Sequence, residues 1–333
     1  MRDRIRAVQF GCGPIGCAVA KLAIQRPNIK LVGAVDIDKS KIGRDLGEVM
    51  GMDKKLGIPI TDDVDGLLAK TKVDIVFHQT TSSLEMVAPQ LTQLLGYGVN
   101  IVSTTEELAY PFTTQPKLAA KIDKVAKANK ATVLGTGINP GFLMDSWVLF
   151  MTAVCQEVKQ VKAVRIQDAR PRRLPFQKKI GAGCTPEEFQ KLVEAGTLRH
   201  VGLTESITMI AAGLGWKLDD ITESIEPVIA QKRVESQYIV VEPGQASGVR
   251  QVGRGLRGSE EVITLEFEAS LGTPESYDAI YITGNPNMEV VVKEGTHGDI
   301  ATAAIVVNAA RRVVEAPPGL ITMKDLPIVI CAP

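Results

Sequence analysis

Cysteine, histidine and aromatic residues are scarce in this sequence of 333 residues, which has 5 Cys, 3 His and 5% Phe, Trp and Tyr. The cysteines form no CxxC pair, and none has a histidine nearby at metal-ligand spacing. This excludes a disulfide framework and a zinc site, and no metal is expected. Reduced thiols of this kind are typical of a cytoplasmic protein.

The chain also has no excess of charge of either sign, with 38 Lys and Arg against 38 Asp and Glu. Such a balance disfavours nucleic-acid binding, which needs a basic field. No apolar run approaches the ~18 residues of a membrane helix, and the N-terminus shows no signal-peptide core. We expect a cytoplasmic protein without a membrane partner.

Short apolar strands alternate with helical stretches over the first half of the chain. Residues 5–10 and 30–36 read as strands around a helix from Pro14 to about Gln25. The same pattern continues with strands at 73–78, 99–103 and 131–135 and helices at 84–95 and 114–128. Alternation of this kind predicts an α/β fold with a doubly wound parallel (Rossmann) sheet.

The pattern changes after Gly141. Longer strands are expected at 161–168, 236–242, 262–268 and 288–293, helices at 186–195 and 204–213, and turns at 243–248 and 253–255. This indicates a second, α+β domain on an open sheet. A strong helix at 299–315 is expected to return to the first domain. The predicted division is 1–141 plus 298–333 for the dinucleotide-binding domain, and 142–297 for the second.

A glycine motif lies between the first strand and the first helix. Its glycines permit a tight turn, close approach to a pyrophosphate, and close packing of helix on strand. The helix N-terminus adds N–H groups and a positive dipole end. The predicted phosphate-binding residues are Gly11, Gly13, Pro14, Ile15 and Gly16.

Asp36 lies twenty residues after Gly16, at the end of the second strand, where a carboxylate accepts the ribose hydroxyls. The carboxylate favours NAD because it repels a 2′-phosphate. Lys39, Lys41 and Arg44 follow and could offset that repulsion, so NADP stays open. Alternatively, these cations only solvate a helix face.

Two further strand ends carry polar residues, at the sheet edge where ligands bind in such folds. Thr80 and Thr81 follow the fourth strand and are candidates for contacts to the nicotinamide ribose. Glu106 and Glu107 follow the fifth strand. A partly dehydrated carboxylate there would suit proton transfer, whereas capping of a helix start is the simpler alternative.

Seven segments together resemble the 2,4-diaminopentanoate dehydrogenase family, which includes the native amine dehydrogenases and is a distant relative of dihydrodipicolinate reductase. They are GCGPIG, VFHQTTSS, VSTTEELAYP, GTGINPGFLMD, RIQDARPRRLPFQKKIGAG, HVGLTES and HGDIATAA. The resemblance implies NAD(P)-linked oxidative deamination of an amine, reversible as reductive amination of a ketone with ammonia. It also implies a homodimer formed through the second domain.

The resemblance shifts the choice between the two glutamates. In wider relatives a catalytic Lys follows the fifth strand, and matching VSTTEELA to those patterns puts Glu106 at that place. Glu106 would accept a proton from the substrate ammonium, and the carbon would then lose a hydride to the nicotinamide. Water attacks the iminium with help from Glu106, and ammonia leaves.

Other candidates come from matched family motifs. Asn139 begins NPGF, which is also a turn, and Thr302 ends the GDxAT pattern after His297. In the second domain, Gln167 and Asp168 stand where dehydrogenases of simple monoamines have Asn-His, with Arg165 close by. A pocket with both charge signs suits a zwitterionic diamino acid. The alternative is a salt bridge between Asp168 and an arginine that only organises the loop.

Competing functions have discriminating features. Dihydrodipicolinate reductase has paired histidines and a KxDxPSGTA-like loop, both missing here, and homoserine dehydrogenase needs Lys at position 106. An amine dehydrogenase for simple amines is the alternative enzyme. A non-catalytic nucleotide-sensing protein is the alternative of another class, and amine-dependent reduction of NAD separates it from an enzyme.

Overall fold

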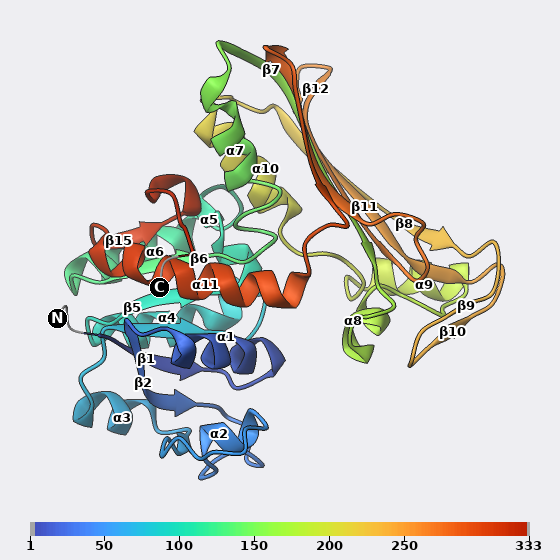
Figure 1. Cartoon of the computed structure of the whole chain (residues 1–333). Helices are drawn as coiled ribbons and strands as arrows, with labels where there is room; N and C mark the ends of the chain where they lie inside the picture. The colour runs from blue at the N-terminus through green and yellow to red at the C-terminus, as the bar shows by residue number, and fades with distance from the viewer. Residues whose placement is uncertain (1–3, 332–333) are drawn as a thin grey trace. The chain divides into compact units, whose positions relative to one another are not determined.

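A computed structural model of the chain describes residues 4–331, which fall into two compact units (Figure 1). Unit 1 comprises residues 1–142 and 297–333, and unit 2 comprises residues 143–296. The expected ranges also include residues 1–3 and 332–333, which lie outside the described residues. No helix among residues 4–331 combines the length and the apolar character needed to cross a membrane.

Unit 1 is built on a parallel sheet of seven strands, in the order β15-β6-β5-β4-β1-β2-β3. The predicted α/β fold is confirmed, and β1, which leads into the glycine motif, lies between β4 and β2. The strands are β1 Ile5–Phe10, β2 Ile29–Val35, β3 Ile60–Thr61, β4 Ile75–His78, β5 Asn100–Ser103, β6 Thr132–Gly135 and β15 Gly319–Ile321.

Helices cover both faces of this sheet, because each strand is apolar on both sides. Ala7 and Phe77 pack with α1 and α11 on one face, whereas Val8 and Val76 pack with α4 and α6 on the other. The late helix thus joins unit 1, as expected. The helices are α1 Pro14–Gln25, α2 Leu46–Val49, α3 Val64–Lys70, α4 Leu84–Gly96, α5 Pro111–Thr114, α6 Pro116–Ala128 and α11 Gly298–Glu315, with 3-10 turns at Glu106–Leu108 and Met323–Asp325.

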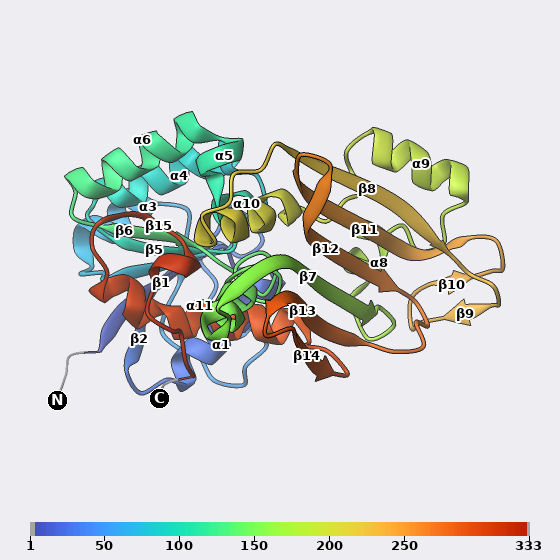
Figure 2. The ribbon, with the colours of Figure 1, turned by 90° about the horizontal axis from the view of Figure 1, so that it is seen from above.

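Unit 2 contains a mixed sheet of six strands, in the order β14-β13-β7-β12-β11-β8 (Figure 2). Strand β7 lies parallel to β12 and antiparallel to β13. The strands are β7 Glu157–Asp168, β8 Asp220–Ile229, β11 Ala246–Arg257, β12 Glu260–Ser270, β13 Tyr277–Asn285 and β14 Met288–Lys293. The helices are α7 Ser146–Met151, α8 Leu174–Lys179, α9 Pro186–Glu194 and α10 Leu203–Gly213, with a 3-10 turn at Thr152–Val154.

Several expectations for unit 2 were wrong. The strand predicted at 236–242 is only a small hairpin of β9 Val234–Glu235 and β10 Val240–Val241. Of the turn predicted at 243–248, residues 243–245 do form a turn, but 246–248 and the whole turn predicted at 253–255 belong to the long strand β11. Strands β8 and β13 were not predicted. The reason lies in tertiary packing. A Cβ on Gly253 would lie 2.9 Å from Ile207 of α10, so the glycine marks a close helix–sheet contact and not a turn.

Figure 1 shows this sheet nearly edge-on, with α8, α9 and α10 on the same side of it. The opposite face, which has no described helix of unit 2 against it, carries charged side chains. There the Glu266 carboxylate lies 2.9 Å from Lys162 Nζ and 2.7 Å from an Arg250 guanidinium nitrogen, both on neighbouring strands. The two cations keep the pKa of Glu266 below its usual value although burial raises it.

The contact at Gly253 can be tested by adding a side chain. Gly253→Val would force a β-branched residue against α10, and overpacking of this kind costs about 1–3 kcal/mol. Arg254→Val is the matched control, because the neighbouring side chain points to the other face and is 35% exposed. We expect urea unfolding to show the loss for Gly253→Val and a change below about 1 kcal/mol for the control. Equal losses would contradict close packing at Gly253.

Candidate functional site

The glycine motif forms a turn that leaves no room for side chains at two of its three glycines. Gly11 has a φ of +87°, and a Cβ there would lie 2.0 Å from the Gln79 carbonyl oxygen. A Cβ on Gly16 would lie 1.8 Å from the Gly11 carbonyl oxygen. Around Gly13, by contrast, a Cβ would meet nothing within 4 Å. The turn is therefore closely packed at Gly11 and Gly16 and open at Gly13. This leaves the space beside the backbone that a pyrophosphate needs.

Helix α1 begins directly at this opening. Gly13 is its N-cap residue and provides no side-chain cap, and Pro14 occupies the first helical position. The first N–H groups of a helix lack partners within the helix and attract anions. The residues present here therefore fit a dinucleotide.

Two glutamines support the turn from below, and sequence reasoning missed them. Gln9 is fully buried in β1, and its Nε2 donates to the Gly11 carbonyl at 2.9 Å and to Gln79 Oε1 at 2.6 Å. A polar amide inside the apolar run IRAVQF was the available signal, because a buried polar group requires partners.

Asp36 ends the second strand as expected and binds back to the glycine turn. Its carboxylate accepts hydrogen bonds from the Cys12 N–H at 2.8 Å and the Asp38 N–H at 2.9 Å, and Lys41 Nζ lies at 3.1 Å. Burial raises the pKa of Asp36, but these donors more than offset the effect and hold it below its usual value. Asp36 is therefore ionised at neutral pH. Of the three cations considered, Lys41 pairs with it.

The polar residues after β4 and β5 form a connected group. His78 is fully buried, and its two ring nitrogens lie 2.9 Å from Ser103 Oγ and 2.8 Å from Gln90 Oε1. Burial lowers the pKa of His78 to about 4, so the imidazole is neutral at pH 7. Thr80 is exposed beside it, whereas Thr81 is half-buried and its carbonyl accepts from Thr105 Oγ1 at 2.9 Å.

The two glutamates after β5 have different surroundings. Glu107 Oε2 accepts from the Leu84 N–H at 2.8 Å and from Gln115 Nε2 at 2.6 Å, so it anchors the start of α4. Glu106 is half-buried in the turn Glu106–Leu108. A Cβ on Gly135 would lie 2.4 Å from the Leu108 carbonyl carbon, so β6 packs tightly against this turn. Of the two glutamates, Glu107 is therefore the one whose carboxylate caps the start of a helix.

The segment before the unit boundary contacts the start of α11. The Ile138 N–H donates to Thr302 Oγ1 at 3.4 Å, which ties the residue next to Asn139 to the helix. Gly141 has a φ of +121°, and a Cβ there would lie 2.5 Å from the Gly137 nitrogen. NPGF thus does form a tight turn. His297 is exposed and stands as N-cap residue immediately before α11.

In unit 2, Arg165 has a structural role, which corrects the expectation that it meets a substrate. Its side chain is 2% exposed, and its guanidinium donates to Asp278 at 2.8 Å and to the Thr296 carbonyl at 2.8 Å. Burial lowers the pKa of Arg165 to about 10. Removal of a partner from such a buried pair would be strongly destabilising, so the pair is a fixed part of the sheet.

Gln167 and Asp168 point to opposite faces at the end of β7. Gln167 is buried and accepts from Arg172 at 3.0 Å. Asp168 accepts from Arg170 Nε at 2.7 Å and from the Gly272 N–H at 3.2 Å. These donors lower the pKa of Asp168 despite the opposing effect of burial. The salt bridge between Asp168 and an arginine, which was the alternative to a substrate-binding role, is therefore present and involves Arg170.

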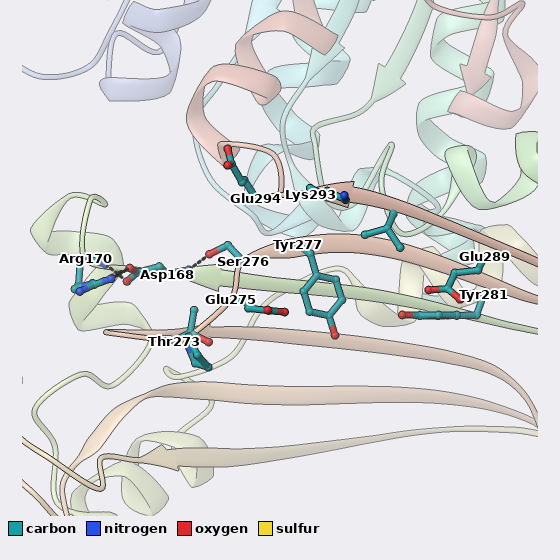
Figure 3. Close-up of a pocket in the computed structure, with 12 residues that line it drawn as sticks. Asp168, Arg170, Thr273, Glu275, Ser276, Tyr277, Tyr281, Glu289, Lys293 and Glu294 are labelled. Atoms are coloured by element: carbon teal, nitrogen blue, oxygen red, sulfur yellow. Dashed lines mark hydrogen bonds and ion pairs between the residues drawn. The ribbon is translucent and has the colours of Figure 1, made fainter.

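Asp168 also lies at one end of a groove of about 800 Å³ in unit 2 (Figure 3). Figure 3 shows its side chain directed at Arg170, while Tyr277 and Tyr281 follow the groove along β13. Glu289 of β14 lines the far end. The groove is therefore lined by side chains of both charge signs.

Two family models match the chain. The model described as 2,4-diaminopentanoate dehydrogenase C-terminal domain matches residues 142–332, and that described as dihydrodipicolinate reductase, N-terminus, matches residues 5–129. Together they cover both units.

Individual relatives agree with these models. The 2,4-diaminopentanoate dehydrogenase of Acetoanaerobium sticklandii is 33% identical, over 98% of this chain and 94% of the relative. The amine dehydrogenase of Streptomyces virginiae is 22% identical, over 97% and 96%. The solved structure of the amine dehydrogenase from Mycobacterium smegmatis has a TM-score of 0.87 at 26% identity, over 99% and 98%. The chain therefore belongs to the 2,4-diaminopentanoate dehydrogenase family, and it is an oxidoreductase that acts on amine donors with a nicotinamide cofactor.

Proposed function

We propose that this protein is a 2,4-diaminopentanoate dehydrogenase that prefers NAD and releases ammonia from its substrate. The observation that carries the proposal is the 33% identity to the Acetoanaerobium sticklandii enzyme across nearly both whole chains. An amine dehydrogenase for simple amines is the second candidate, favoured by the similarity to the Mycobacterium smegmatis structure. A nucleotide sensor without activity is disfavoured by the family.

The preference for NAD is supported by Asp36. In the proposal, Gly11, Gly13, Pro14, Ile15 and Gly16 surround the pyrophosphate, Asp36 accepts from the ribose hydroxyls, and Thr80, Thr81 and Asn139 lie toward the nicotinamide end. The ionised Asp36 carboxylate would repel a 2′-phosphate. Lys41 reduces that repulsion, since its ammonium lies 3.1 Å from the carboxylate. NADP is therefore a weaker second cofactor.

Cofactor affinity tests the role of Asp36. Asp36→Ala should raise the Kd for NADH about tenfold, because hydrogen bonds to a charged group contribute about 1.5–3 kcal/mol, while the Kd for NADPH should change little. Asp38→Ala is the matched control, since this carboxylate also lies near Lys41, at 3.4 Å, but is 45% exposed. Fluorescence titration of the apoprotein gives both constants. An unchanged NADH/NADPH ratio in Asp36→Ala would mean that Asp36 is not the ribose ligand.

Glu106 is the proposed proton acceptor. It removes a proton from the substrate ammonium, which frees the nitrogen lone pair that expels the hydride. The nicotinamide, when bound, accepts that hydride. Glu106 releases the ammonium proton to solvent, then takes a proton from the water that attacks the iminium carbon and gives it to the nitrogen of the carbinolamine. Ammonia leaves as the hydroxyl proton passes back to Glu106 and the ketone forms. Glu106 lies just after the carboxyl end of β5, at the sheet edge where ligands bind in folds of this kind, and this position supports the role.

Two isosteric variants separate the glutamates. Glu106→Gln cannot take a proton, so kcat should fall by about 10²–10⁴ while the Kd for NADH stays unchanged. Glu107→Gln keeps an amide oxygen for the Leu84 N–H, so kcat should change less than about threefold and only the thermal midpoint should fall. Steady-state kinetics and thermal unfolding provide the comparison. The opposite ranking of kcat would transfer the catalytic role to Glu107.

Substrate choice is assigned to Asp168 of unit 2. We propose that Asp168 attracts the ammonium that does not react, and His297 and Thr302 are proposed as further polar contacts. Gln167 is left out because its side chain points to the opposite face and accepts from Arg172. Arg165 is left out because Asp278 already neutralises it. The Asp168 carboxylate is 19% exposed and stays ionised, which supports attraction of a cation even though Arg170 shares it.

A pair of substrates tests this assignment. The protein should oxidise 2,4-diaminopentanoate far faster than 2-aminopentane, and Asp168→Asn should raise KM for the diamino acid about tenfold with little effect on the monoamine. Glu289→Gln, a carboxylate in the same groove, should leave both KM values unchanged. Equal turnover of the two substrates, or equal KM changes, would favour a general amine dehydrogenase.

We further propose a cytoplasmic homodimer formed through unit 2. All five cysteines are free thiols, which supports a reducing compartment.

A further inference from the structure

A buried chain of hydrogen bonds joins the ends of two neighbouring strands in unit 1. His78 at the end of β4 contacts Ser103 at the end of β5, with 2.9 Å between ring nitrogen Nδ1 and Ser103 Oγ. Ser103 Oγ lies 3.0 Å from Thr105 Oγ1, which donates to the Thr81 carbonyl at 2.9 Å. The chain thus runs from strand β4 across β5 and back to the loop after β4.

The position of His78 is unusual for a residue with only a packing role. Its side chain has no exposed surface and stacks near Phe10, with 5.1 Å between ring centroids. A phenylalanine would fill the same space without the cost of burying two ring nitrogens. Both nitrogens are engaged, one by Ser103 and the other by Gln90 of α4. Polar networks of this kind, when satisfied, fix one geometry.

The hydrogen bonds in this region also hold the two residues on either side of Glu106. Thr105 is held by its side chain, and its N–H also donates to Ser103 Oγ at 3.2 Å. Glu107 is held by the Leu84 N–H, and its own N–H donates to the Ser82 carbonyl at 3.3 Å. The backbone on both sides of Glu106 is therefore fastened to the loop that follows β4.

We propose that His78 is a positioning residue for the reaction: through Ser103 and Thr105 it fixes the backbone that carries Glu106, and thereby the direction of the Glu106 carboxylate. The inference rests on the proposed role of Glu106. It assigns no proton transfer to His78, whose side chain is fully buried. A displacement of about 1 Å in a proton acceptor can reduce the rate about a hundredfold, so a fixed backbone at this point matters for turnover.

Two substitutions of His78 each keep one of its two hydrogen bonds and remove the other. In His78→Asn the amide stands near the former Nδ1 and can keep the bond to Ser103. In His78→Gln the amide stands near the former Nε2, so the bond to Gln90 stays and the bond to Ser103 is lost. We expect His78→Gln to lower kcat ten- to a hundredfold, with the Kd for NADH within twofold, and His78→Asn to stay within about threefold in kcat. The limb of the kcat–pH profile that belongs to Glu106 should shift only in His78→Gln.

Asn100→Ala is the matched control for stability. Asn100 bridges strands at the other end of β5, donating to the Asp74 carbonyl at 2.8 Å and accepting from the Thr132 N–H at 2.9 Å. It should lower the thermal midpoint without lowering kcat. Equal loss of kcat in His78→Asn and His78→Gln, in proportion to their loss of stability, would overturn the proposal. If the His78 variants do not fold, Thr105→Val against Thr105→Ser tests the same chain, because only serine keeps the hydroxyl.

A double variant separates this inference from the proposed function. In a Glu106→Gln background, His78→Gln should cause no further loss of kcat, because residues that act through one group are not additive. A normal kcat in Glu106→Gln would refute the proposed role of Glu106 itself. A low kcat in Glu106→Gln together with a normal kcat in His78→Gln would refute only the positioning role.

Discussion

The close approach of α1 to the carbonyl of Gly11 is the constraint on which the rest of unit 1 depends. A Cβ on Gly16 would lie 1.8 Å from that oxygen, so no side chain fits between helix and turn. The approach directs the start of α1 at the space above Gly13. It also places the Cys12 N–H within 2.8 Å of Asp36 at the end of the next strand. The glycine turn and the Asp36 carboxylate are thus parts of one hydrogen-bonded arrangement.

The sequence predicted unit 1 much better than unit 2 because the two sheets are buried differently. Strands covered on both faces are short and mostly apolar, such as Ile5–Phe10, and the signal is local. In unit 2 one face carries charges, and strand β11 contains Gly253 and Gly255 where α10 packs against it. In the sequence, a glycine that lets a helix pack against a strand cannot be told from a glycine that forms a turn. Strand β11 was therefore mistaken for loops.

In the candidate site, too, some residues could be predicted from the nearby sequence, whereas others depend on partners far away in the chain. Gly11, Gly16 and Asp36 could be predicted because strand, turn and helix succeed one another at fixed spacing. The pairing of Arg165 with Asp278, 113 positions away, could not be predicted, because register across β7 and β13 decides it. The anchoring of Glu107 at the start of α4 likewise depends on the contact between two loops. A charged residue near a motif thus acquires its role from a partner that the motif does not contain.

The exposure of each partner also explains which charges can take part in binding. Arg165 and Asp278 are 2% and 1% exposed, so separating them would leave a buried charge without compensation at a cost of about 3–5 kcal/mol. The pair of Asp36 and Lys41 differs because the lysine side chain is 23% exposed and can return to water. Separation of a more exposed pair costs much less. Lys41 can therefore yield Asp36 to a ribose hydroxyl, or turn toward a phosphate, while the Arg165 pair holds the sheet of unit 2 unchanged. A fully buried ion pair fixes the structure, whereas a pair with one partly exposed partner leaves its carboxylate available for a ligand.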